Sequence, residues 1–227
     1  MAPSDTFTIT AAPGTDIWRK PPATDVFNAP TALPESSTTT ATNLRTSGPL
    51  TSFLSARLSL NFTPKEQYDQ GGLLLSFYRR NPPSNASDSP APHQKPQKWI
   101  KAGVEHYNGA PRLSTVACDA WADWSVADLH PSPSSTNTAA ATTTTTETGW
   151  TTLLVEKDQD GNGTGVWVYR VAEATGEKVP LREVCWVFGD APEEWDVEVR
   201  AMAARPAKGA EGGLVVEFAG LEVKWAT

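Results

Sequence analysis

Cysteine, histidine and clustered basic residues are all scarce in this sequence. It has two cysteines and three histidines among 227 residues, and none of them are spaced like the ligands of a zinc site. The net charge is −7, and the 19 basic residues form no run, so neither nucleic acid nor an anionic membrane surface is an expected partner. No apolar run approaches the roughly 20 residues that span a bilayer.

The N-terminal residues lack the basic stretch and the apolar stretch of a signal peptide. We therefore expect a cytoplasmic protein. In that compartment Cys118 and Cys185 are predicted to be reduced thiols in the core rather than a disulfide.

Helical periodicity is also missing. Short alternating, β-branched or aromatic runs recur instead, separated by Gly, Pro, Asn and Asp. They predict ten strands, near Phe7–Thr10, Phe53–Leu60, Gly72–Tyr78, Lys98–His106, Arg112–Ala117, Trp150–Lys157, Gly165–Ala172, Val179–Val187, Val197–Ala203 and Leu214–Lys224. Many short strands without helices between them indicate an all-β sandwich or jelly roll.

Two polar segments interrupt the strands, at about 81–96 and 131–148. They are rich in Pro, Ser, Thr and Asn and lack the apolar side chains that would offset the entropy of ordering them. Thr38–Thr42 is a weaker example. Because strands of the same character resume on both sides, we interpret these segments as loop insertions within a single domain, residues 1–227.

The most informative stretch is Trp99–Glu105. Successive side chains of a strand point to opposite faces, so Trp99, Lys101, Gly103 and Glu105 share one face and Ile100, Ala102 and Val104 share the other. The second set is a core stripe. The first places an aromatic plate and two opposite charges, whose Cβ atoms lie roughly 13 Å apart at ~3.3 Å per residue, on one sheet surface. That surface either receives a polar ring-shaped ligand or is a solvated face without a role.

Further candidates lie on neighbouring segments. Carboxylates, amides and hydroxyls beside aromatic rings suit sugar recognition, because sugar hydroxyls need directional partners and sugar rings stack on indoles. The alternatives are a turn residue for Asp123 and a plain core residue for Trp124. Added to Trp99, Lys101 and Glu105, the predicted ligand-binding residues are Asp69, Gln70, Ser114, Asp123 and Trp124.

Several stretches, in their order along the chain, resemble the DUF1349 family of concanavalin A-like proteins, which includes a fungal "regulation of enolase" protein. They are Tyr68–Leu74, Trp99–Glu105, Leu113–Val116, Asp123–Ser125, Met202–Pro206 and Val216–Phe218. The resemblance runs from about Trp18 to about Val223. It implies a jelly-roll β-sandwich of two curved antiparallel sheets.

The resemblance also implies a function. Concanavalin A-like domains include sugar-binding lectins and glucanases, so a lectin-like, carbohydrate-binding role is the expectation drawn from the fold. The fungal relative implies a cytoplasmic protein linked to glycolysis or galactose use through contact with an enzyme such as enolase.

Hydrolysis is a weaker prediction. A glycosidase needs two carboxylates about 5–10 Å apart across the bond, and the glucanase pattern of two glutamates with an aspartate between them on one strand is missing. Glu105 with Asp69 or Asp123 is the remaining pair. No Gly-x-Ser-x-Gly nucleophile elbow is present, so no catalytic residue is predicted.

No metal or cofactor is predicted either. Asp158–Gly163 matches the first half of a calcium loop, but Tyr169 stands where the bidentate glutamate belongs. Asp-Gly and Asn-Gly are strong hairpin signals, so we expect a hairpin turn joining Trp150–Lys157 to Gly165–Ala172.

The leading hypothesis is a non-catalytic module whose concave sheet face holds a carbohydrate or another small polar, polyhydroxylated metabolite. The rival is a protein-interaction regulator of a glycolytic enzyme such as enolase, and the third is a glycoside hydrolase-like enzyme. Convergence of Trp99, Lys101 and Glu105 on a cavity would favour the first. A flat exposed apolar patch would favour the second.

Overall fold

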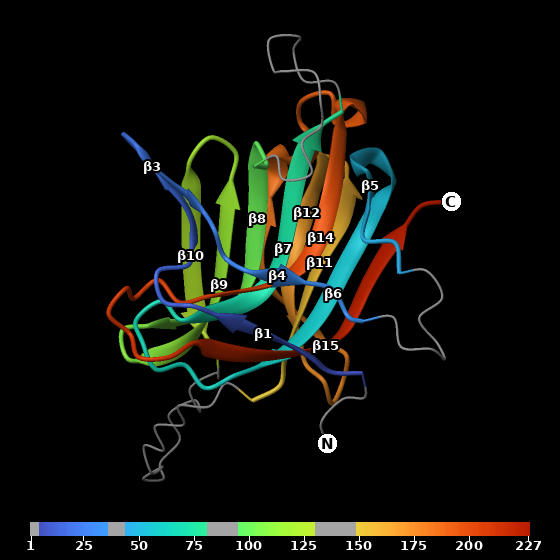
Figure 1. Ribbon diagram of the computed structural model, residues 1–227. Helices are drawn as coiled ribbons and strands as arrows, with labels where there is room; N and C mark the ends of the chain where they lie inside the picture. Colours follow the sequence, from blue (N-terminus) through green and yellow to red (C-terminus); the bar gives the residue numbers. More distant parts are fainter. Residues whose placement is uncertain (1–4, 36–43, 81–94, 130–148) are drawn as a thin grey trace, which may run out of the picture.

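Two curved antiparallel sheets packed face to face form the body of the computed structural model, which describes residues 5–35, 44–80, 95–129 and 149–227 (Figure 1). The six-stranded sheet has the order β1 (Phe7–Ala11), β15 (Leu214–Trp225), β6 (Phe53–Asn61), β11 (Thr151–Asp160), β12 (Gly163–Val171) and β13 (Lys178–Val184). This is the predicted jelly-roll sandwich, and the described residues contain no α-helix.

The seven-stranded sheet carries the segments of interest. Its order is β10 (Ala122–Asp128), β9 (Ala110–Cys118), β8 (Lys98–Tyr107), β7 (Gln70–Arg79), β14 (Trp195–Ala204) and β4 (Thr31–Ala32), with β5 (Ser47–Pro49) also paired to β14. A separate hairpin joins β2 (Ile17–Lys20) to β3 (Thr24–Phe27). Short 3-10 turns occupy Leu50–Ser52, Cys185–Phe188 and Pro192–Glu194.

All ten predicted strands are present. Strands β2, β3, β4, β5 and β10 were not predicted, because four of them have two to four residues and β10 is an edge strand whose side chains are mostly solvent-accessible. The predicted continuation of a strand to Val187 is wrong: the chain leaves β13 at Val184 and enters a 3-10 turn.

The main core lies between the two sheets. Ile100, Ala102 and Val104 of β8 are buried there, as their alternation predicted, beside Leu73, Leu75 and Phe77 of β7. The opposite layer supplies Leu58, Leu60, Val155, Val168, Val216 and Phe218. Burying this stripe fixes the register of β8, so Lys101, Gly103 and Glu105 must point to the other face of the sheet.

That other face carries a second apolar cluster beneath the β2–β3 hairpin. Its buried members are Ile17, Leu74, Trp99, Val116, Cys118, Met202 and Ala204, with Trp18, Phe27, Ala29, Ala122 and Trp124 packed at its margin. Figure 1 shows the hairpin beside β10, at one edge of the sheet. Arg19 anchors it by donating to the Gln97 carbonyl (2.9 Å) and to Asp25 (2.9 Å), which also pairs with Lys95 (2.6 Å). The larger sheet is therefore covered on both faces at this end.

Cys118 and Cys185 are free thiols in the structure. Cys118 is buried as predicted, whereas Cys185 is exposed, because it begins the 3-10 turn after β13 instead of lying inside a strand. The structure describes no helix long and apolar enough to cross a membrane. Of the predicted insertions, residues 81–94 and 131–148 lie outside the described residues, as does Thr38–Thr42.

Candidate functional site

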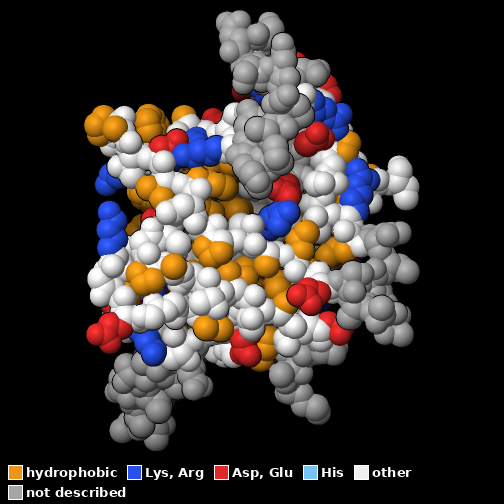
Figure 2. Space-filling model, viewed as in Figure 1, with side chains coloured by type: hydrophobic (Ala, Val, Ile, Leu, Met, Phe, Trp, Pro, Cys, Tyr) orange, Lys and Arg blue, Asp and Glu red, His pale blue; other side chains and the backbone are white. Residues whose placement is uncertain are grey.

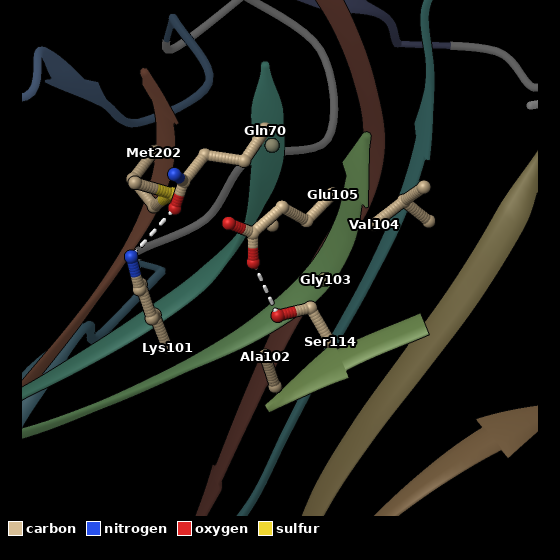
Figure 3. A pocket seen from close by; sticks show the side chains of 10 residues that line it. Gln70, Lys101, Ala102, Gly103, Val104, Glu105, Ser114 and Met202 are labelled. Atoms are coloured by element: carbon tan, nitrogen blue, oxygen red, sulfur yellow. Dashed lines mark hydrogen bonds between the residues drawn. The ribbon is translucent and has the colours of Figure 1, made fainter. Parts of the chain in front are cut away.

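A small polar hollow lies on the outer face of the larger sheet, where β7, β8, β9 and β14 run side by side. Its volume is about 10 Å³, room for about one water molecule. Figure 3 shows the side chains of Gln70, Lys101, Glu105, Ser114 and Met202 turned toward one another, while Val104 points to the core. Three of the four strands thus contribute polar groups to one place.

The base of the hollow is formed by two paired glycines, Gly72 of β7 and Gly103 of β8. A Cβ atom on Gly103 would lie 2.0 Å from the Gly71 carbonyl oxygen, and one on Gly72 would lie 2.3 Å from that of Ala102. Only glycine permits this close approach of the two strands. The missing side chains leave the space that Lys101, Glu105 and their partners surround.

Two hydrogen-bonded pairs line the hollow. Lys101 Nζ donates to Gln70 Oε1 (2.7 Å), and Ser114 Oγ donates to Glu105 Oε2 (2.7 Å) (Figure 3). The pairs are extended on each side: Gln70 Nε2 donates to the Tyr68 carbonyl (3.1 Å), and Trp124 Nε1 donates to Ser114 Oγ (2.9 Å). Each polar group is therefore held in a fixed orientation, as a preorganised binding site requires.

The charges in the hollow are largely withdrawn from solvent. Glu105 is 5% exposed and Lys101 is 6% exposed. Burial raises the pKa of Glu105, and the positive charge of Lys101 and the hydrogen bond from Ser114 oppose that rise. Lys101 Nζ lies 5.8 Å and 6.0 Å from the ring centroids of Trp18 and Trp99, and 3.6 Å from Asp16 Oδ1. The ammonium thus sits between two indoles and beside a carboxylate.

Three of the predicted site residues present no free group to the hollow. Trp99 is 1% exposed within the outer apolar cluster, so it offers no open stacking surface to a ligand, although its ring centroid lies 6.0 Å from Lys101 Nζ. Asp69 is completely buried, and both of its carboxylate oxygens pair with Arg205 (2.9 and 2.8 Å). Asp123 is exposed on β10 and pairs with Arg182 (2.5 Å). The last two carboxylates have structural partners outside the hollow.

Four residues that the sequence pattern did not reveal lie at the site together with the predicted Trp124: Tyr68, Tyr107, Trp18 and Asp16. Tyr68, Tyr107 and Trp124 form an aromatic wall, with Trp124 edge-on to Tyr107 (4.8 Å between centroids) and to Tyr68 (6.2 Å). Trp18 extends the wall, edge-on to Trp124 at 6.3 Å, and Asp16 supplies the carboxylate near Lys101. The one signal for Tyr68 and Tyr107 is their position, just before Gln70 and just after Glu105, which are register partners.

The remaining candidates behave as local structure. Asp160 Oδ1 accepts from the backbone N–H groups of Asn162 (2.7 Å) and Gly163 (3.1 Å), which closes the predicted β11–β12 hairpin. His106 turns away from Glu105, and its Nδ1 lies 3.0 Å from the Glu66 carbonyl oxygen. Within the described part of the chain, no group of three or more His, Cys, Asp or Glu side chains is placed to hold a metal ion.

The two antiparallel sheets define an all-β sandwich, with a polar hollow on the outer face of its larger sheet. The chain belongs to the DUF1349 family, described as "protein of unknown function", whose pattern matches residues 2–225.

Two similar proteins illustrate the reach of this family and fold. An uncharacterised protein of Emericella nidulans is 37% identical over 220 residues, which cover 96% of this chain and 86% of that protein. A crystal structure of a functionally unknown protein from Saccharomyces cerevisiae has a TM-score of 0.59 at 16% identity, and the match covers 100% of this chain and 91% of that one. The second likeness concerns the fold alone.

Proposed function

We propose that this protein binds a carbohydrate or another polyhydroxylated metabolite at the hollow. The observation that carries the proposal is the convergence of Gln70, Lys101, Glu105 and Ser114, all nine-tenths buried, beside the aromatic wall of Tyr68, Tyr107 and Trp124. An isolated buried charge is costly to maintain, so a set of charged and polar side chains gathered on a sheet face calls for a reason beyond stability. Recognition of a polar ligand supplies one.

The chemistry of the groups suits hydroxyl recognition. An ionised carboxylate has about four acceptor positions, and an ammonium has three donors. Glu105 and Lys101 therefore retain hydrogen-bonding capacity beyond their bonds to Ser114 and Gln70. Ring hydroxyls can both donate and accept, so one sugar edge can satisfy both groups.

The size of the hollow indicates how a sugar would lie. With room for about one water, it admits a hydroxyl or a hydroxymethyl group but not a whole ring. Tyr68 is 39% exposed and Trp124 is half-buried, so the ring itself would rest on the aromatic wall, where apolar sugar faces stack. The ligand is then anchored by one polar edge in the hollow.

Binding is proposed rather than hydrolysis. The two carboxylates that the sequence offered as partners for Glu105, Asp69 and Asp123, are held in ion pairs with Arg205 and Arg182. Asp16, which the structure does bring near, lies 3.6 Å from Lys101. The cytoplasmic location and a glycolytic partner enzyme stay predictions.

A thermal-shift screen against mono- and oligosaccharides tests the proposal, because a ligand stabilises the folded state by about RT ln(1 + [L]/Kd). For any saccharide that binds, Lys101→Met and Glu105→Gln should each weaken affinity about ten- to hundredfold, since a hydrogen bond to a charged group contributes about 1.5–3 kcal/mol. Asp196→Asn is the matched control, because Asp196 is an exposed carboxylate paired with Arg80 on the same sheet. Unchanged affinity in both hollow variants would refute the assignment.

A further inference from the structure

We infer that the hollow selects uncharged polyhydroxylated ligands over the phosphate and carboxylate derivatives of the same compounds. This inference rests on the proposed function and adds the charge class of the ligand. It is carried by the balance of charges around the hollow, in which every cation already faces a carboxylate.

Lys101 is the only cation whose side chain lines the hollow among the described residues. Its ammonium donates to Gln70 and lies 3.6 Å from Asp16, on the segment that leads into β2. The indoles of Trp18 and Trp99 flank it. A phosphate approaching Lys101 would therefore meet Asp16 and two apolar rings, without the open fork of donors that phosphate sites present.

Arg112 is a second cation near the hollow, because it is the register partner of Glu105 across β8 and β9. Its guanidinium pairs with Asp128, which is in turn its own register partner on β10. Four residues are therefore register partners, side by side across strands β7, β8, β9 and β10: Gln70, Glu105, Arg112 and Asp128. Arg112 is engaged on the side away from the hollow and is not a free anion receptor.

The remaining charge is negative. Asp16 and Glu105 together oppose the single charge of Lys101, and Arg112 is matched by Asp128. An anionic ligand would add a further negative charge close to two carboxylates in a site screened from water, where like charges repel strongly. A neutral ligand with several hydroxyls avoids this repulsion and donates to the carboxylates.

The experiment compares matched pairs by calorimetry: D-glucose with glucose 6-phosphate, D-mannose with mannose 6-phosphate, and D-galactose with galactose 1-phosphate. The inference predicts that the neutral member of any binding pair binds at least tenfold more tightly. In Glu105→Gln, which removes one carboxylate charge while keeping the side-chain shape, the preference should shrink at least threefold. Asp196→Asn, on the same sheet face but outside the hollow, should retain it.

The outcomes separate the inference from the proposed function. Phosphates that bind as tightly as the parent sugars, or more tightly, would overturn the charge selectivity and leave the binding site in place. If no member of the panel and no other saccharide binds, the proposed function fails and the inference fails with it. If Glu105→Gln loses its cooperative melting transition, Asp16→Asn serves as the second test of the same charge balance.

Discussion

Glu105 carries an energetic cost that follows from its burial. It is a carboxylate that the fold buries and that burial penalises, since its pKa is raised mainly by loss of water. The folded protein therefore holds a proton on Glu105 at a pH at which the unfolded chain has already released it. In that range the free energy of unfolding falls as the pH rises, because the native state binds more protons than the unfolded state.

The substitution Glu105→Gln removes this pH-dependent contribution to the free energy of unfolding, while it keeps an oxygen that can accept a hydrogen bond from Ser114. The melting temperature of the variant relative to that of the wild-type protein should therefore be higher at about pH 7, well above the ordinary glutamate pKa, than at about pH 4, just below it. Thermal unfolding at the two pH values measures it. If the melting temperature of the variant minus that of the wild-type protein is the same at both pH values, or is higher at the lower pH, the interpretation of Glu105 as a buried, destabilising carboxylate is wrong.

Asp69 and Arg205 are the opposite case, a buried pair whose role is structural. Arg205→Met leaves the fully buried Asp69 carboxylate without its bidentate partner and should cost about 3–5 kcal/mol in the free energy of unfolding. Arg80→Met is the control, because its partner Asp196 is exposed and such pairs contribute at most about 1 kcal/mol. Urea denaturation compares the two. Equal losses would show that Asp69 is solvated rather than buried.

At the scale of the strand, the site depends on the close approach of β7 and β8. Gly103→Ala introduces a Cβ atom 2.0 Å from the Gly71 carbonyl oxygen, so the two strands must separate, at a cost of about 1–3 kcal/mol for overpacking. Gly161→Ala, in the β11–β12 turn with no neighbour within 4 Å, is the matched control. Chemical denaturation of both variants provides the comparison. An equally stable Gly103→Ala variant would mean that the strands can separate freely.

Sequence patterns predicted the long strands well, because alternation is a local property of the chain. That is why Lys101 and Glu105 could be placed on one face, with Ile100, Ala102 and Val104 on the other. The pattern could not show that Trp99 is buried, since it shares its apolar cluster with Ile17, which belongs to a four-residue strand far away in the chain. Short strands lack enough residues to display a period.

The ion-pair partners of Asp69 and Asp123 could not be predicted from the sequence for a similar reason. Asp69 meets Arg205, and Asp123 meets Arg182, through contacts between strands that are distant in the sequence. No spacing rule links such residues. The same holds for Asp16 and Trp18, which reach Lys101 only because the β2–β3 hairpin folds over the sheet. For a binding site on a sheet face, the sequence thus predicts which residues of one strand share that face, but it does not predict which residues of other strands lie beside them.

At the scale of the whole molecule, the hollow lies on the outer face of the larger sheet, on strands β7, β8, β9 and β14. On the face seen in Figure 2, basic and acidic side chains are interspersed with apolar ones, as expected from a sequence whose basic residues form no run. The aromatic wall beside the hollow is the feature that a sugar ring would contact. It also contains a spectroscopic probe, since the indole N–H of Trp124 donates to Ser114.

Ligand binding at the hollow can be followed by heteronuclear NMR of the tryptophan indole N–H groups during a titration. The chain has nine tryptophans, and Trp124→Phe and Trp225→Phe assign the two resonances that matter. With the saccharide that gives the largest thermal shift, the Trp124 resonance should move progressively to saturation. The resonance of Trp225, which donates to the Arg45 carbonyl away from the hollow, should stay in place. A saturating shift at Trp225 with none at Trp124 would contradict binding at the hollow.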